Sequence, residues 1–267
     1  DAKKIFKSMT KVDAISCNTM MTCYIQNMYF DEAFIIFEQM WDRQIKPTKV
    51  TYATILECHS RQKDITKGRR LHSCILEMEL GENAAVCNAI IRMYGKCGSL
   101  DDAIQIFSLI PDRNVVTWTT LIAGYSKHMQ HKEAIDCYDL MQLEGIFPDC
   151  ITFSCILKCC GNLRDSGKGC EIHAEISRKG LLQKDLVLSS TLIDMHAKCG
   201  FLSIAKEVFD KLIVRDVVSW TTLIMGYVEE ELFDEALNCF DQMQSEGLSP
   251  NVVTFICILK ACGGTES

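Results

Sequence analysis

One 35-residue segment occurs three times in this chain, and this repetition constrains its fold more than any other feature. Residues 115–149 read VVTWTTLIAGYSKHMQHKEAIDCYDLMQLEGIFPD, and residues 217–251 match them at an offset of 102 residues. Residues 14–48 form a third copy, 101 residues upstream of the middle one. Repetition at one spacing predicts a stacked architecture, in which each repeat buries its apolar face against its neighbours.

Each copy predicts two helices. The first is expected to begin at an apolar or aromatic residue, which is Cys17, Trp118 or Trp220. The second carries apolar residues at i, i+3, i+4 and i+7, a spacing that gives a helix one buried face. In the middle copy these residues are Ala134, Cys137, Tyr138 and Met141. Just past the second helix, Gly145 and Gly247 suit a left-handed cap.

The segments between the copies are repeats as well. Two are 31 residues long and are expected to lack about one turn at the end of the second helix. Two others form a third type, and partial repeats stand at both ends, so the sequence is expected to be an excised piece without a targeting segment. The boundaries are 1–13 (partial), 14–48, 49–83, 84–114, 115–149, 150–185, 186–216, 217–251 and 252–267 (partial).

Composition narrows the functional classes. No run of 18 apolar residues occurs, so no membrane span is predicted. The 16 cysteines contain no C-x-x-C pair, and several recur at equivalent repeat positions, such as Cys97 and Cys199, so we expect reduced core thiols. His173 and Glu175 match half of a zinc-deaminase signature, but His173 occupies the slot of His72, a packing position. No metal, cofactor or catalytic residue is predicted.

The sequence blocks resemble pentatricopeptide repeats, in the plant class that alternates P, L and S motifs. The matching blocks are VVTWTTLIAGY with EALNCFDQM, MYGKCGSLDDA with MHAKCGFLSIA, and KGRRLHSCI with KGCEIHAEI. The resemblance covers the whole chain and assigns 14–48, 115–149 and 217–251 to P, 49–83 and 150–185 to L, and 84–114 and 186–216 to S. It implies an all-α fold, a right-handed superhelical solenoid of helix-turn-helix repeats. It also implies single-stranded RNA binding with one base per repeat.

In this family the fifth and last residues of a repeat read the base, and the second residue sandwiches it. The reading pairs carried over are Asn18 with Thr48, Asn88 with Asn114, Thr119 with Asp149, Ser190 with Asp216, and Thr221 with Asn251. The L-repeat pairs, Ala53 with Asn83 and Ser154 with Asp185, follow the pattern poorly. The sandwiching residues would be Ile15, Val50, Ala85, Val116, Ile151, Val187, Val218 and Val253. From the residues alone, helix caps and turns explain the short polar side chains equally well.

The chemistry of the pairs predicts a target. Guanine offers two N–H donors to a carboxylate, whereas adenine and cytosine offer an acceptor beside a donor, which an amide can match. With the parallel orientation that the family resemblance implies, the predicted site is 5′-Y-N-Y-G-N-G-A-3′, where N stands for a weakly read base. The net charge of −7 opposes RNA binding. However, Lys96, Lys127 and Lys198 share the thirteenth position of their repeats, where they are expected to contact phosphates, with a merely solvated face as the alternative.

The resemblance finally implies a biological role. Relatives of this class direct C-to-U editing of transcripts in mitochondria or chloroplasts, and the chemistry belongs to C-terminal regions that these residues do not include. The chain is therefore expected to select the site without being an enzyme. Its expected partners are single-stranded RNA and, through the L repeats, multiple organellar RNA editing factors. The alternatives are a protein-binding helical scaffold and a factor for RNA processing or stability.

Overall fold

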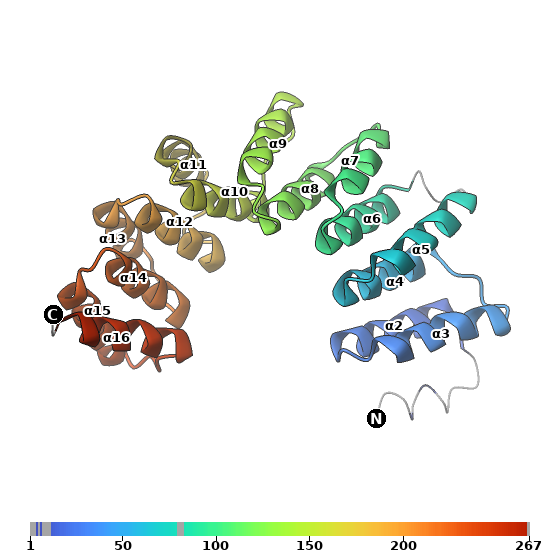
Figure 1. Ribbon diagram of the computed structural model, residues 1–267, viewed down its shortest axis with the longest axis horizontal. Coiled ribbons are helices and arrows are strands. Elements are labelled where there is room, and N and C mark those ends of the chain that lie inside the picture. The colour runs from blue at the N-terminus through green and yellow to red at the C-terminus, as the bar shows by residue number, and fades with distance from the viewer. Residues whose placement is uncertain (1–3, 5, 7–11, 79–82, 266–267) are drawn as a thin grey trace. The chain divides into compact units, whose positions relative to one another are not determined.

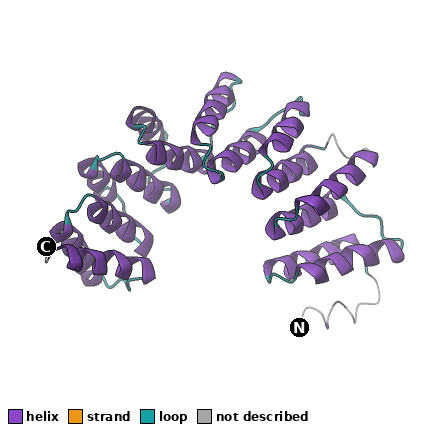
Figure 2. Cartoon of the chain, viewed as in Figure 1, coloured by secondary structure: helices purple, strands orange, loops and turns teal. Residues whose placement is uncertain are grey.

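Every regular element in the described part of the chain is a helix (Figures 1 and 2). The computed structural model describes residues 4, 6, 12–78 and 83–265. Most of the expected partial repeat at 1–13 therefore lies outside the described residues. The chain divides into two compact units, Asp1–His128 and Met129–Ser267.

The first unit is a stack of helix pairs. Its helices are α2 Ala14–Gln26, α3 Phe30–Asp42, α4 Lys49–Gln62, α5 Ile65–Glu77, α6 Ala84–Cys97, α7 Leu100–Leu109 and α8 Val115–Lys127. The first helices of successive repeats, α2, α4, α6 and α8, contact one another in order. Each second helix contacts the first helix of its own repeat and that of the next repeat, so the unit has two layers.

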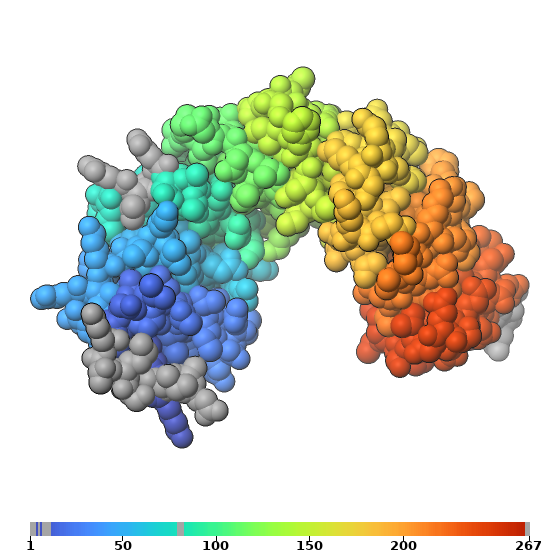
Figure 3. Space-filling view, turned by 180° about the vertical axis from the view of Figure 1, so that it is seen from behind, coloured from blue at the N-terminus to red at the C-terminus, as the bar shows by residue number. Residues whose placement is uncertain are grey.

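The second unit repeats this arrangement. Its helices are α9 His131–Leu143, α10 Cys150–Leu163, α11 Ser166–Arg178, α12 Leu186–Lys198, α13 Leu202–Asp210, α14 Val217–Glu229, α15 Phe233–Ser245 and α16 Val252–Thr265. Helices α10, α12, α14 and α16 form the layer of first helices, and α11, α13 and α15 each contact the two first helices beside them. In the space-filling view, the colours change in order along each unit, because successive repeats lie next to one another (Figure 3).

The predicted apolar stripes form the core. Ala134, Tyr138 and Met141 of α9 are all buried, as are the equivalent residues of α15 apart from the half-buried Phe240. The second helices of the two 31-residue repeats are about one turn shorter, as predicted. Helices α7 and α13 have 10 and 9 residues, whereas α3, α9 and α15 have 13 each.

The predicted starts of the first helices were wrong by three residues. Helix α14 begins at Val217 and not at Trp220, and α2 and α8 begin equally early. The cause is the residue before each helix: Asp216 Oδ1 accepts the Ser219 N–H at 2.8 Å and satisfies a donor of the first turn. Trp220 is instead a core residue, with its ring 4.5 Å from that of Phe209.

The turn inside each repeat has a conformation that the sequence did not indicate. The fifteenth residue of every full repeat has a positive φ, between 54° and 84°. These residues are Met28, Lys63, Gly98, Met129, Arg164, Gly200 and Glu231. Only the two short repeats use glycine there. The predicted left-handed caps at Gly145 and Gly247 are confirmed, with φ of 74° and 78°.

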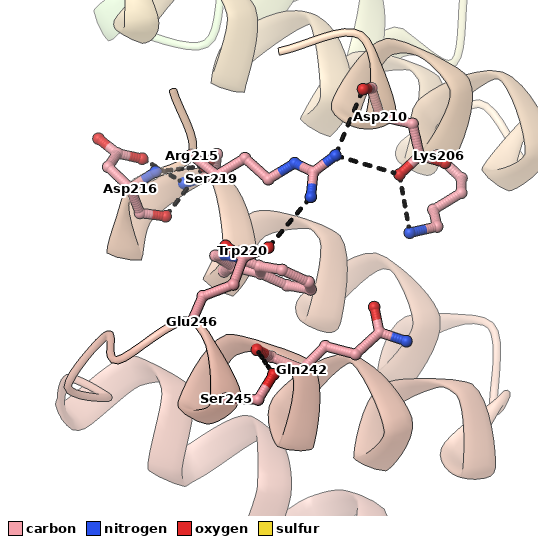
Figure 4. A network of polar contacts seen from close by, with 9 residues as sticks. All are labelled: Lys206, Asp210, Arg215, Asp216, Ser219, Trp220, Gln242, Ser245 and Glu246. Carbon is pink, nitrogen blue, oxygen red and sulfur yellow. Dashed lines mark hydrogen bonds and ion pairs between the residues drawn. The ribbon is translucent and has the colours of Figure 1, made fainter. Parts of the chain in front are cut away.

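A polar network joins α13, α14 and α15 (Figure 4). Arg215 Nη1 donates to Glu246 Oε1 at 3.1 Å, and Arg215 Nη2 donates to the Asp210 carbonyl at 3.3 Å. Trp220 Nε1 donates to the other Glu246 oxygen at 3.1 Å. These bonds fix the segment just before Asp216, and thereby the start of α14.

Candidate nucleic-acid interface

An exposed aliphatic side chain recurs at the second residue of each first helix. In the second unit, Val187 is 67% exposed and Val218 is 55% exposed. The other members are Ile15, Val50, Ala85 and Val116 in the first unit, and Ile151 and Val253 in the second, all of them exposed. Single exposed apolar residues are ordinary on protein surfaces, but a row at one repeat position within each unit is typical of a binding surface.

The fifth residue lies one turn further along the same helix face. Asn88, Thr119, Ser190 and Thr221 are buried, and Asn18, Ala53 and Ser154 are half-buried. Two of the hydroxyls donate to the preceding turn, Ser190 to the Leu186 carbonyl at 2.8 Å and Thr221 to the Val217 carbonyl at 2.6 Å. Because each hydroxyl has one proton, these oxygens are left as acceptors.

Two fifth residues contain an unsatisfied polar atom. The side-chain carbonyl oxygens of Asn18 and Asn88 are buried and have no hydrogen-bond partner among the described residues. A buried polar atom without a partner costs about 1–3 kcal/mol, and native proteins normally satisfy such atoms with protein, water or ligand. These two oxygens therefore stay unsatisfied unless another molecule supplies a hydrogen-bond donor.

The last residue of each full repeat is the N-cap of the next first helix. Thr48, Asn83, Asn114, Asp149, Asp185, Asp216 and Asn251 each accept a backbone N–H from that helix. The structure thus confirms that these residues cap helices. Capping uses only some of the polar atoms in their side chains. In Asp149, Asp185 and Asp216 the cap uses Oδ1, and Oδ2 makes no hydrogen bond within the described residues.

A groove of about 420 Å³ in the second unit brings the predicted positions together. It runs across α10, α12 and α14, and its lining includes Val187, Ser190, Lys198, Asp216 and Val218. The second, fifth, thirteenth and last positions of the repeats therefore meet at one place. A groove of about 350 Å³ on the first helices of the first unit likewise includes the predicted Val50, Ala53 and Ala85.

The comparisons with known proteins agree with this geometry. The family model described as the PPR repeat family matches residues 12–61, 113–162 and 215–264, more than half of the chain. The model described as the PPR repeat matches residues 85–115 and 187–217. The chain belongs to the pentatricopeptide repeat family.

The relatives of this pentatricopeptide repeat chain are longer proteins. A chloroplastic pentatricopeptide repeat-containing protein of Arabidopsis thaliana is 31% identical over 98% of this chain and 32% of its own length. A mitochondrial one from the same plant is 34% identical over 100% of this chain and 26% of its own length. The chain thus spans about a third of the curated relatives that it matches.

A solved structure confirms the helical-repeat fold. The crystal structure of the pentatricopeptide repeat protein PPR10 in complex with an 18-nt psaJ RNA element has a TM-score of 0.79 and 23% identity to this chain. The match covers 100% of this chain and 40% of PPR10.

The three expected phosphate-binding lysines have different surroundings in this pentatricopeptide repeat chain. Lys96 Nζ lies 2.9 Å and 3.2 Å from the two carboxylate oxygens of Glu57, and Lys198 Nζ lies 2.8 Å from Asp194 Oδ2. Lys127 is exposed. Burial alone would raise the pKa of Glu57, but hydrogen bonds from Lys96 and Arg61 hold it below its ordinary value. The sequence did not indicate that acidic neighbours offset two of the three charges.

The histidines of the pentatricopeptide repeats are packing residues. His173 Nδ1 lies 3.0 Å from His196 Nε2, and in the equivalent place His72 Nδ1 lies 3.0 Å from the Tyr94 hydroxyl. Within the described ranges, no group of three metal-ligating side chains occurs, and no helix is long and apolar enough to cross a membrane.

No disulfide bond joins the sixteen cysteines, which all lie in the described part of the chain, but they are not all core residues. The prediction holds for Cys58, Cys159, Cys239 and Cys257, which are buried. Burial raises the pKa of the Cys58 thiol to about 12. The prediction was wrong for three cysteines, whose side chains are exposed: Cys74, Cys170 and Cys262.

Proposed function

We propose that this chain binds single-stranded RNA with one base per repeat and selects the target of an organellar C-to-U editing factor. The observation that carries the proposal is the groove across α10, α12 and α14. It presents two exposed valines, a hydroxyl and a carboxylate from the repeat positions that the family resemblance assigns to base recognition. The proposed RNA site is YNYGNGA, written 5′ to 3′.

The groove suits one flat base. Val187 and Val218 occupy the second positions of consecutive first helices, so a base between them would bury apolar surface on both of its faces. Asp216 Oδ2 has no partner in the described part of the chain and can accept N–H donors from the base edge. Guanine presents two such donors, N1–H and N2–H, and is the base we assign to this repeat.

The comparisons support the wider role. PPR10 was crystallised with an RNA element, and several relatives bear the word chloroplastic or mitochondrial in their names. We place this chain in one of those organelles as the RNA-selecting part of a longer protein. The repeats at 49–83 and 150–185, which fit the base-reading pattern poorly, are assigned to protein partners of the editing-factor class.

The test is binding of labelled RNAs containing YNYGNGA, measured by fluorescence anisotropy with each base varied. We expect wild-type protein to prefer guanine at the sixth base and Asp216→Asn to prefer adenine there, with the other positions unchanged. The effect of one such contact should be about 1–3 kcal/mol, or about 5- to 150-fold in relative affinity. Asp136→Asn, on the exposed face of α9, is the control because it removes the same charge away from the groove.

Two outcomes oppose the proposal. If both variants and the wild type bind all RNAs equally, the fifth and last residues are caps only, and base reading is excluded. If none of the proteins binds RNA, the groove serves another ligand, and the protein-scaffold alternative replaces the proposal.

A further inference from the structure

Thr254, the third residue of its repeat, contacts both members of the preceding repeat's reading pair. Its backbone N–H donates to Asn251 Oδ1 at 2.9 Å, and its hydroxyl lies 3.1 Å from the same oxygen. The hydroxyl oxygen also lies 2.7 Å from Thr221 Oγ1. Thr254 is fully buried, so water does not compete for these bonds.

These contacts decide which side of the Asn251 amide faces outward. A backbone N–H can bond only to the oxygen of a side-chain amide, not to its NH₂ group. The backbone N–H on Oδ1 therefore holds the carbonyl against α16 and leaves Nδ2 as the outward group. The last residue consequently presents a donor when it is asparagine, and an acceptor when it is aspartate.

The hydroxyl of Thr221 is fixed as an acceptor, whereas Asn251 presents a donor. Its proton goes to the Val217 carbonyl at 2.6 Å, so the Thr254 hydroxyl donates to Thr221 Oγ1 at 2.7 Å, and the lone pair left on that oxygen can only accept from a base. One acceptor from Thr221 and one donor from Asn251 match the N6–H and N1 of adenine. Which atoms Thr221 and Asn251 present as donors and acceptors therefore depends on the buried hydroxyl of Thr254 as well as on the two residues themselves.

We infer that the third residue of a repeat is a positioning residue, which sets the base specificity of the repeat before it. This inference rests on the proposed RNA-binding function. Thr117 and Thr152 repeat the contact, since their hydroxyls lie 3.3 Å from Asn114 Oδ1 and 2.7 Å from Asp149 Oδ1.

The contact is not made at every repeat boundary: the Ser219 hydroxyl donates to the backbone carbonyl of Asp216 at 2.9 Å and not to its carboxylate. Val86 follows Asn83, and Leu188 follows Asp185, so these two caps are held by backbone N–H groups without a hydroxyl. Asn83 and Asp185 end the repeats 49–83 and 150–185, the two that follow the family's base-reading pattern poorly.

The experiment compares Thr254→Val with Thr254→Ser, using RNAs that carry adenine or guanine at the seventh base. The valine variant keeps the shape but lacks the hydroxyl, and should lower the preference for adenine about two- to tenfold. The serine variant restores the hydroxyl and should restore most of the preference. Guanine preference at the sixth base, read by Ser190 and Asp216, serves as an internal control that should not change.

The reverse change supplies an independent test. Val86→Thr places a hydroxyl beside Asn83, which should create a preference for adenine and cytosine over guanine and uracil at the second base. Unchanged preferences in both Thr254→Val and Val86→Thr, with a wild type that discriminates at the seventh base, would overturn the inference and leave the proposed function intact. A wild type indifferent to the seventh base would overturn base reading at this repeat itself.

Discussion

The hydroxyl oxygens of Thr221 and Thr254 lie 2.7 Å apart, across the boundary between two consecutive repeats. Thr221 is a predicted base-reading residue, and Thr254 belongs to the N-terminal cap of the next helix. Recognition and helix capping therefore share the same hydrogen-bonded atoms. A substitution at either position should change both the stability of the repeat boundary and the group presented to RNA.

Glu57 should weaken RNA binding in the wild type. It lines the groove on the first helices of the first unit and holds Lys96 in an ion pair. Glu57→Gln would remove one negative charge and release Lys96 toward phosphate. We expect tighter binding and a steeper dependence of affinity on salt, with a slope larger by up to about one unit. Anisotropy titrations between low and moderate salt measure both quantities.

The control for this prediction is Glu171→Gln on α11, where the carboxylate pairs with Lys168. It changes the net charge equally on a second helix, outside both grooves. Equal gains in affinity from the two variants would show that only total charge matters.

Val187 should contribute to RNA affinity and little to folding. Its side chain is 67% exposed, so truncation removes few native contacts. A base stacked on it would bury that surface, and loss of two methyl groups should cost about 1 kcal/mol of binding free energy. Val187→Ala should therefore weaken RNA binding about fivefold while the thermal midpoint stays nearly constant. Ile213→Ala is the matched control, because Ile213 is 81% exposed and lies outside the groove.

The His173–His196 pair should make stability depend on pH. Burial, together with a smaller effect of the neighbouring His173, lowers the pKa of His196 from 6.5 to about 4. The unfolded chain therefore binds a proton below pH 6.5 that the folded chain does not accept until about pH 4. Stability should fall as the pH falls through this range, by on the order of 2–3 kcal/mol from this group.

His196→Tyr tests this dependence, since the chain itself uses Tyr94 opposite His72. The variant should lose less stability between pH 7 and pH 4.5, as measured by the midpoint of urea unfolding. Some dependence should remain, because burial also lowers the pKa of His59 to about 4. An identical slope in the variant would exclude His196 as the source.

The sequence allowed prediction of the repeats, the helix pairs and the exposed face, because all three depend on local periodicity. Val187 and Val218 could be placed by repeat position alone, and both line the groove in the second unit. The partnering of Lys96 by Glu57 could not be predicted, since those residues are 39 positions apart and belong to different repeats. The contact between Thr221 and Thr254 could not be predicted either, because it depends on how two neighbouring helices pack.

The backbone at Gln44 should be strained, and substitution by glycine should relieve that strain. Gln44 has a φ of 56° just after α3, in the position that glycine occupies as Gly145 and Gly247 in the other two copies of the segment at 14–48, which are residues 115–149 and 217–251. A side chain in this left-handed region costs about 1–2 kcal/mol, partly offset by the greater freedom of glycine in the unfolded chain. Gln44→Gly should therefore stabilise the protein by about 0.5–1 kcal/mol in urea unfolding. The mirror experiment is Gly145→Ala, where an added Cβ would meet no atom within 4 Å, so only the backbone penalty acts and stability should fall. If Gln44→Gly destabilised the protein instead, contacts of the Gln44 side chain would outweigh its backbone strain.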